Sequence, residues 1–236
     1  MKTYFTHQTT AAMLIAVTAV STLGFAATAR SAKVAPPPGI VEIPRDVLIF
    51  PANISTGSGD ATPAAQQTAT QKQAQEIVTN AFREYLAKSN IGVAIYTKRL
   101  PSVQRAVAEG LKAEDAAAGP GDDDRKALRF AQVVGAAEYI TLDVTNYKYD
   151  AASRTASFNV NVLRKSVDDD GASLATVGKP ASGVAPSDVA TPRQEGSALA
   201  RAAAQVAEET FQDLYPQVAS LNAANQAKMN AKGKKK

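Results

Sequence analysis

The chain of 236 residues contains no cysteine and no tryptophan, and its single histidine is His7. His7 lies in a stretch that we interpret below as a removable leader, so the mature chain lacks histidine as well. These absences exclude serine or cysteine nucleophiles activated by histidine, zinc sites with nitrogen and sulfur ligands, and disulfide bonds. An enzyme of this composition is left with carboxylate, lysine, tyrosine or hydroxyl chemistry.

The net charge of +4 is unevenly distributed along the chain. Residues 228–236 carry five lysines and no acid, whereas residues 30–227 hold 20 basic and 22 acidic residues. Because this body is slightly acidic and lacks an aromatic and basic motif, we predict no specific nucleic-acid binding. The lysine cluster predicts salt-dependent contact with an anionic polymer or lipid. A solubilising terminus explains the cluster equally well.

The first 29 residues have the pattern of a secretory signal peptide. Lys2 precedes an apolar run over 11–27, and Ala27-Thr28-Ala29 provides small residues before the cleavage point. The alternative is an uncleaved anchor, but the run is shorter than the ~20 residues that span a bilayer. We therefore predict an exported protein, periplasmic or extracellular, with no transmembrane segment after cleavage.

Composition divides the remaining chain into three parts. Residues 30–45 contain a triple proline and predict a Pro-rich spacer. Residues 46–219 carry the periodic apolar patterns of a single domain. Residues 220–236 are polar and rich in lysine, which predicts a disordered tail.

Hydrophobic periodicity predicts the elements of the domain. Helices are expected over 71–90, 102–109, from Asp124 to Gly135, and over 194–218. Strands are expected over 47–50, 91–97, 138–149, 155–167 and, more weakly, 174–179. Residues 114–121 and 181–192 are expected to form loops. This order predicts an α+β fold: a mixed sheet with a strand-helix-strand start, a three-stranded antiparallel meander and a C-terminal helix packed on the sheet.

Five segments in this order carry a family resemblance. They are VLIFP (47–51), IGVAIYTKR (91–99), FAQVVGAAEYITLDV (130–144), FNVNVLRKSVDDDG (158–171) and the Ala-rich segment 196–215. Together they resemble a group of extracytoplasmic bacterial domains. The group includes the periplasmic domain of the curli secretion lipoprotein CsgG, the penicillin-binding-protein activator LpoB and the amino-terminal domain of TolB. The resemblance covers about residues 45–217.

The resemblance implies an envelope protein that binds another protein, with homo-oligomerisation as in the curli relatives. The chain departs from these relatives in lacking the lipidated cysteine, alternating membrane hairpins and propeller repeats. We therefore expect no channel. The group offers no catalytic residues that could be transferred to this sequence.

Two acidic runs are candidate metal ligands. Asp122-Asp123-Asp124 has carboxylates suited to a divalent cation, but acids before a helix also offset its dipole, and we favour the second role. Asp168-Asp169-Asp170-Gly171 is typical of a solvated hairpin turn. The sequence therefore predicts no metal site and no cofactor.

One candidate patch lies on the strand predicted over 138–149. Strict alternation would place Tyr139, Asp143, Tyr147 and Tyr149 on one face, opposite Ile140. Such a patch could bind a partner, or its tyrosines could cover the base of a helix. No catalytic residue is assigned.

The function that we predict is an exported, non-enzymatic, envelope-associated protein-binding domain with an assembly or accessory role. Docking would use a sheet edge or the exposed face of the meander. The alternatives are a small-ligand or cell-wall-polymer binding module and, with less support, a carboxylate-dependent hydrolase.

Overall fold

The computed structural model describes residues 46–55 and 69–233. The predicted signal peptide (1–29) and spacer (30–45) lie outside these residues. The described residues belong to one compact unit, which runs from Gly39 to Lys236.

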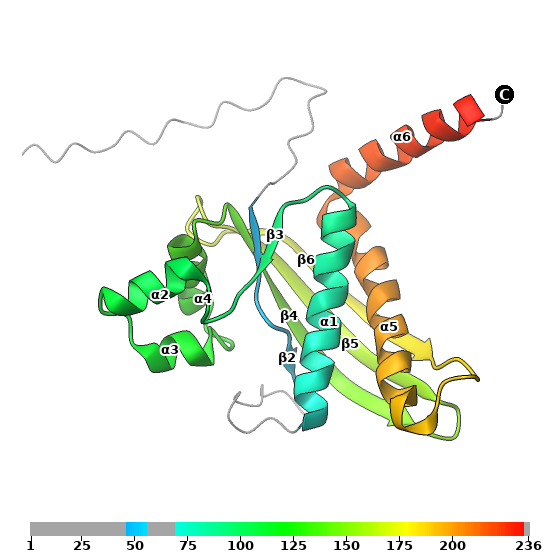
Figure 1. Ribbon diagram of the computed structural model, residues 1–236. Helices are drawn as coiled ribbons and strands as arrows, with labels where there is room; N and C mark the ends of the chain where they lie inside the picture. Colours follow the sequence, from blue (N-terminus) through cyan, green and yellow to red (C-terminus); the bar gives the residue numbers. More distant parts are fainter. Residues whose placement is uncertain (1–45, 56–68, 234–236) are drawn as a thin grey trace, which may run out of the picture. The chain divides into compact units, whose positions relative to one another are not determined.

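The described chain forms six strands and six helices (Figure 1). In order they are β1 (Val47–Ile49), β2 (Asn53–Ile54), α1 (Ala69–Lys88), β3 (Val93–Ile95), α2 (Pro101–Ala108), α3 (Ala113–Ala118), α4 (Asp124–Val134), β4 (Glu138–Asp150), β5 (Thr155–Ser166), β6 (Ser173–Val184), α5 (Thr191–Leu214) and α6 (Pro216–Gly233).

All six strands form one mixed sheet in the order β3-β1-β4-β5-β6, with β2 pairing beside β4. Strand β1 runs parallel to β3 and β4, and β2 is also parallel to β4. Strands β4, β5 and β6 pair antiparallel as a meander. The predicted α+β class is thereby confirmed, including the strand-helix-strand start and the helix on the sheet.

Two cores lie on opposite faces of the sheet. Alternation places Ile140 on one face of β4 and Tyr139 on the other. The first core joins the Ile140 face to α1, α5 and the beginning of α6. The second core joins the Tyr139 face to α2, α3 and α4, through Leu48 and Phe50 of the β1 segment. Figure 1 shows α1 beside α5, and α2–α4 grouped on another part of the sheet.

The contact between β6 and α5 depends on one glycine. Gly183 lies against the backbone of α5, where an added Cβ would be 2.5 Å from the Ala202 nitrogen and closer still to the Ala198 carbonyl oxygen. Real Cβ atoms do not approach so closely. The absence of a side chain at Gly183 therefore allows α5 to pack directly on the sheet.

A half-buried ion pair holds the end of α5. Arg164 donates from Nε and Nη2 to the Glu138 carboxylate at 2.8 and 2.7 Å, and from Nη1 to the Leu214 carbonyl oxygen at 2.7 Å. The guanidinium also lies 4.0 Å from the centre of the Tyr215 ring, and the Tyr215 hydroxyl donates to Glu138 at 3.2 Å. These contacts fix the junction between α5 and α6 against β4 and β5.

Several segments differ from the sequence prediction. Strand β2 lies where no element was predicted, and the helix predicted over 194–218 is divided at Tyr215 into α5 and α6. Residues 113–118 form α3 rather than a loop, because Ala-rich sequence with Glu114 and Asp115 in the first turn favours a helix. Strand β6 continues to Val184, into the predicted loop 181–192. The predicted disordered tail is helical to Gly233 in α6. Val218 is buried in the first core, and the alanines that follow have high helix propensity.

No helix in residues 46–55 and 69–233 is long and apolar enough to span a membrane.

Candidate functional site

A β-bulge divides β4 into two parts with opposite side-chain orientation. Thr145 pairs with Asn159, and Lys148 pairs with Ser157. Between these two pairs, β4 therefore contains one more residue than β5. The extra residue is accommodated where Asn146 adopts a positive φ of 56°. One inserted residue reverses the inward and outward alternation of everything that follows.

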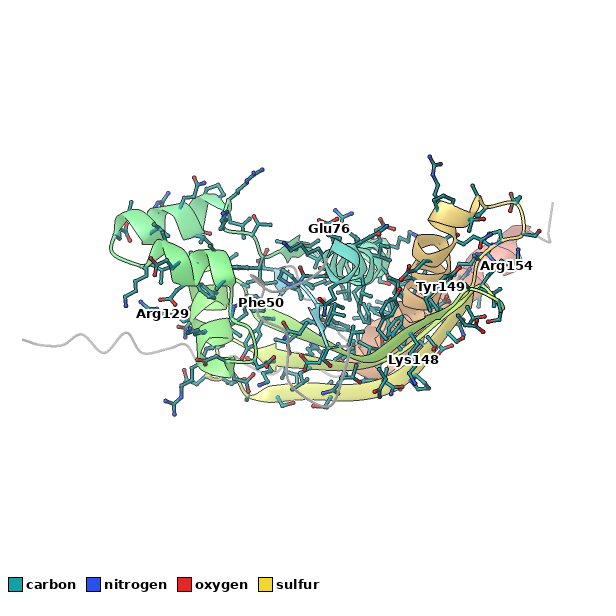
Figure 2. All side chains as sticks on the ribbon, turned by 90° about the horizontal axis from the view of Figure 1, so that it is seen from below. Phe50, Glu76, Arg129, Lys148, Tyr149 and Arg154 are labelled. Carbon is teal, nitrogen blue, oxygen red and sulfur yellow. The ribbon has the colours of Figure 1, made fainter. Side chains whose placement is uncertain are left out.

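The bulge makes the predicted single-face patch wrong. Tyr139 is buried in the second core, while Tyr147 and Tyr149 pack against the first core on the opposite face. Asp143 lies before the bulge and keeps the orientation of Tyr139. Figure 2 shows Tyr149 on the side of the sheet that faces α5 and Lys148 on the other side.

The position of Tyr147 indicates a structural role. Its hydroxyl donates to Oε1 of Glu195 in α5 at 2.7 Å. Burial raises the pKa of Tyr147, and the hydrogen bond to Glu195 and the charge of Glu195 raise it further. The phenol therefore stays neutral and ties β4 to α5.

Asp143 meets a partner that sequence patterns did not suggest. Asn53 of β2 pairs with Asp143 in the parallel ladder, and its Nδ2 donates to Asp143 Oδ1 at 3.0 Å. The same nitrogen lies 3.1 Å from Asp122 Oδ1 and 3.4 Å from the Gly121 carbonyl oxygen. One amide thus joins β2, β4 and the loop between α3 and α4.

The electrostatics around Asp143 disfavour its charged form. Burial raises the pKa of Asp143, the hydrogen bond from Asn53 lowers it, and the charges of Asp122 and Asp124 raise it again. The net effect is a pKa above the ordinary value, so Asp143 takes up a proton at a higher pH than a solvated aspartate.

These residues line a cavity of about 450 Å³, which we call the acidic pocket. Its walls come from β2, β4, β5 and the start of α4: Asn53, Ser55, Gly121, Asp122, Asp123, Asp124, Ala127, Thr141, Asp143, Val144, Thr145, Asn161 and Leu163. The structure therefore brings Asp143 together with the Asp122–Asp124 run.

The three acids of that run have different tasks. Asp123 is the N-cap of α4, where its carboxylate accepts from the backbone nitrogens of Arg125 and Lys126 at 2.9 and 3.1 Å. Asp124 lies 2.6 Å from the Lys165 ammonium, and Asp122 accepts from Asn53. The predicted helix-terminal role is confirmed for Asp123. Within the described ranges, no group of three or more histidine, cysteine or acidic residues is arranged to hold a metal ion.

The outer side of the meander forms a second surface, which adjoins the acidic pocket at Asn161. The ladder places Asn159 opposite Pro180 and Asn161 opposite Gly178. The exposed residues of this surface, which we call the meander face, are Lys148, Asn159, Asn161, Thr176, Gly178, Pro180, Ser182 and Val184. They lie opposite the face on which α5 packs, because β5 buries the alternate residues Phe158, Val160 and Val162 in the first core.

Asn53 was not identified from the sequence. It follows a short apolar strand and belongs to no motif, so only its register beside Asp143 shows its importance. The exposed face of the meander was expected as a docking surface, but its residues could not be named, because alternation along a strand does not say which side a helix covers.

No family model matches the chain, and no curated protein matches it. Similar solved structures include a PelC dodecamer from Paraburkholderia phytofirmans, with 13% identity, coverage of 70% of this chain and 90% of that chain, and a TM-score of 0.36. The LpoB C-terminal domain from Salmonella enterica has 18% identity, covers 59% of this chain and 84% of that chain, and has a TM-score of 0.36. A lipoprotein from Neisseria meningitidis has 14% identity, covers 70% of this chain and 99% of that chain, and has a TM-score of 0.39.

LpoB, which the sequence resemblance named, is thus among the structures similar to this chain. The likeness to CsgG and to TolB stays a prediction.

Proposed function

We propose that the chain is an exported, non-enzymatic, envelope-associated accessory domain that binds a protein partner through the meander face. The observation that carries this proposal is the side-chain content of that face. Its exposed positions on β5 and β6 are asparagine, serine, threonine, glycine, proline and valine, without a charged group among them, and Lys148 at the β4 border is the one charged member of the face.

This composition suits a protein interface. The centres of protein interfaces are depleted of charged residues, because a charge must be desolvated before it is buried. Short side chains such as Ser182 and Thr176 lose less conformational freedom on binding than lysine or glutamate would. Val184, which is 47% exposed, adds apolar area at one end of the face.

The face is a better docking surface than the edge of the sheet. Strand β6 is the edge of the meander, but Pro180 lies in its middle and has no N–H to donate. Proline is tolerated in a sheet where its nitrogen faces away from the ladder, so it removes a donor that an added strand would need. Of the two docking modes expected from the sequence, the structure therefore favours the face.

The polymer-binding alternative has less support. Carbohydrate polymers bind well to flat surfaces with exposed aromatic rings. Tyr147 and Tyr149 are turned toward the first core by the bulge, so among the described residues they add no ring to the meander face.

The absence of cysteine allows a clean test by site-directed crosslinking. Asn159→Cys and Asn161→Cys would each carry a thiol-linked photocrosslinker on the meander face. The matched control is Glu76→Cys, an exposed position on α1 that lies on the opposite side of the sheet (Figure 2). We expect one envelope protein to crosslink in living cells from both asparagine positions and not from Glu76.

The captured protein is then purified and titrated with the full chain. We expect Asn161→Arg to weaken its binding at least tenfold, since the new charge must be desolvated in the interface. Glu76→Arg should leave binding unchanged. Equal crosslinking from all three positions, or equal affinity of the two arginine variants, would refute the meander face as the docking surface.

A further inference from the structure

The helices that follow β1 and β3 lie on opposite faces of the sheet. After β1 the chain continues in the sheet as β2 beside β4, and the next helix, α1, packs in the first core before β3 pairs beside β1. After β3 come α2–α4, which pack in the second core on the other face, and β4 then pairs on the other side of β1.

Such an arrangement opens a crevice at the carboxyl ends of the two strands. Neighbouring connections that depart to opposite faces leave the space between them unfilled, and α/β proteins place their ligands there. In this chain the space lies between the residues after β1 and the residues after β3.

A cleft of about 570 Å³ occupies this position. Phe50, Pro51 and Asn53 line it from the β1 side, and Tyr96, Thr97 and Lys98 line it from the β3 side. The third wall is the segment 117–122 between α3 and α4, which includes Gly119 and Gly121. The volume falls in the range of about 300–1,000 Å³ found for small-molecule sites.

The walls combine an apolar base with a polar rim. Phe50 and Tyr96 are buried, with their ring centroids 5.2 Å apart, and the Tyr96 hydroxyl donates to the Ala116 carbonyl oxygen at 2.9 Å. This hydrogen bond holds α3 against the base of the cleft. Asn53, Gln75, Thr97 and Thr141 supply neutral polar groups around the rim.

Two ammonium groups line the cleft, those of Lys98 and Lys126. The one acid in its wall is Asp122, which accepts a hydrogen bond from Asn53; Asp122, Asn53, Gly121 and Thr141 also line the adjoining acidic pocket. Within the described residues, Lys98 has no acidic partner, and Lys126 forms an ion pair with Asp115 at 3.5 Å with its side chain 48% exposed. Since exposed pairs contribute little, a ligand can compete for both ammonium groups.

We propose that this cleft binds a small organic anion. Its carboxylate or phosphate group contacts Lys98 and Lys126, and its carbon skeleton rests on the Phe50 and Tyr96 side of the cleft. The site is separate from the meander face, so the proposal does not rest on the docking function.

The test uses the full chain, labelled with nitrogen-15 and titrated in an NMR experiment. Three probes distinguish the anionic group and the apolar part: phenylacetate, phenyl phosphate and inorganic phosphate. We expect saturable shifts of the Thr97, Gly119 and Gly121 amides, with tighter binding of the phenyl compounds than of inorganic phosphate. Preference between the first two probes identifies the carboxylate or the phosphate as the group recognised.

Variants then separate a specific site from general attraction to lysine. Lys98→Gln and Lys126→Gln should each weaken binding about tenfold, the loss expected for one hydrogen bond to a charged group. Ala118→Leu should also weaken it, because this exposed residue lines the cleft and the added bulk fills it. Lys148→Gln on the meander face removes the same charge elsewhere and should change nothing.

Three results would overturn the proposal: no saturable shift with any probe, shifts that survive the combined Lys98→Gln and Lys126→Gln substitutions, or an equal loss in Lys148→Gln. Thermal unfolding of each variant serves as the folding control. The substituted side chains are exposed, so all variants should unfold at the temperature of the parent.

Discussion

Replacement of Arg164 by methionine should destabilise the domain strongly. The substitution keeps a long apolar side chain but removes three hydrogen bonds, two to Glu138 and one to the Leu214 carbonyl oxygen. It also leaves the Glu138 carboxylate without its cation, in a place where the Glu138 side chain is only 13% exposed.

The size of the loss follows from the burial of the pair. Removal of one partner from a buried ion pair costs ~3–5 kcal/mol, because the remaining charge is left uncompensated. The Arg164 and Glu138 side chains retain 17% and 13% exposure, so water screens part of the charge and the lower end applies. We expect the free energy of unfolding to fall by ~3 kcal/mol and the midpoint of thermal unfolding to fall by ~6–12 °C.

Urea unfolding followed by far-UV circular dichroism measures this change. The matched control is Arg83→Met, because the Arg83–Glu84 pair is 3.7 Å apart with side chains 45% and 58% exposed. Exposed pairs contribute little, so the control should stay within ~0.5 kcal/mol of the parent. The combined Arg164→Met and Glu138→Gln variant should recover part of the loss, because it removes the unpaired charge.

The reasoning fails if Arg164→Met costs less than about 1 kcal/mol, as for a surface pair. It fails equally if Glu138→Gln restores nothing, since the unpaired carboxylate would then not be the source of the loss.

Three further predictions concern the sheet. Gly183→Ala should lower the free energy of unfolding by ~1–3 kcal/mol in urea titrations, because its methyl group collides with the backbone of α5. Pro180→Thr should increase self-association in analytical ultracentrifugation, since it restores an edge N–H. Burial raises the pKa of Asp143, so the parent protein loses stability as the pH rises through that pKa and the buried carboxyl group ionises. Asp143→Asn cannot ionise, so its free energy of unfolding, measured by urea titration at several pH values, should rise relative to that of the parent as the pH rises.

The matched control for Gly183→Ala is Gly178→Ala on the same strand. The Cβ added at Gly178 would be 3.9 Å from the nearest atom, the Oδ1 of Asn161. A loss equal to that of Gly183→Ala would contradict the close-contact argument. A monomeric Pro180→Thr would show that proline does not protect the edge, and a pH-independent difference for Asp143→Asn would show that this carboxylate ionises normally.

The sequence by itself determined the fold class, because its evidence is local. The alternation of Phe158, Val160 and Val162 predicts a strand with one buried face, and the structure buries these three residues together. Likewise, the run Asp122-Asp123-Asp124 before an apolar periodic segment and Gly135 after it predict the two ends of α4, and the structure has an N-cap at Asp123 and a left-handed C-cap at Gly135. The missing cysteine excluded disulfide bonds and cysteine chemistry without any structure.

The tertiary structure alone decided which side chains meet. A single extra residue at Asn146 turned Tyr147 and Tyr149 away from Asp143, and no local pattern reveals a bulge because pairing with β5 defines it. The bridge from Asn53 to Asp122 and Asp143 joins residues that are 69 and 90 positions apart. The cleft depends on the order β3-β1-β4, which arises from the packing of helices on opposite faces. Sequence periodicity sets the orientation of neighbours along one element, whereas a site is made by the register and connection of several elements.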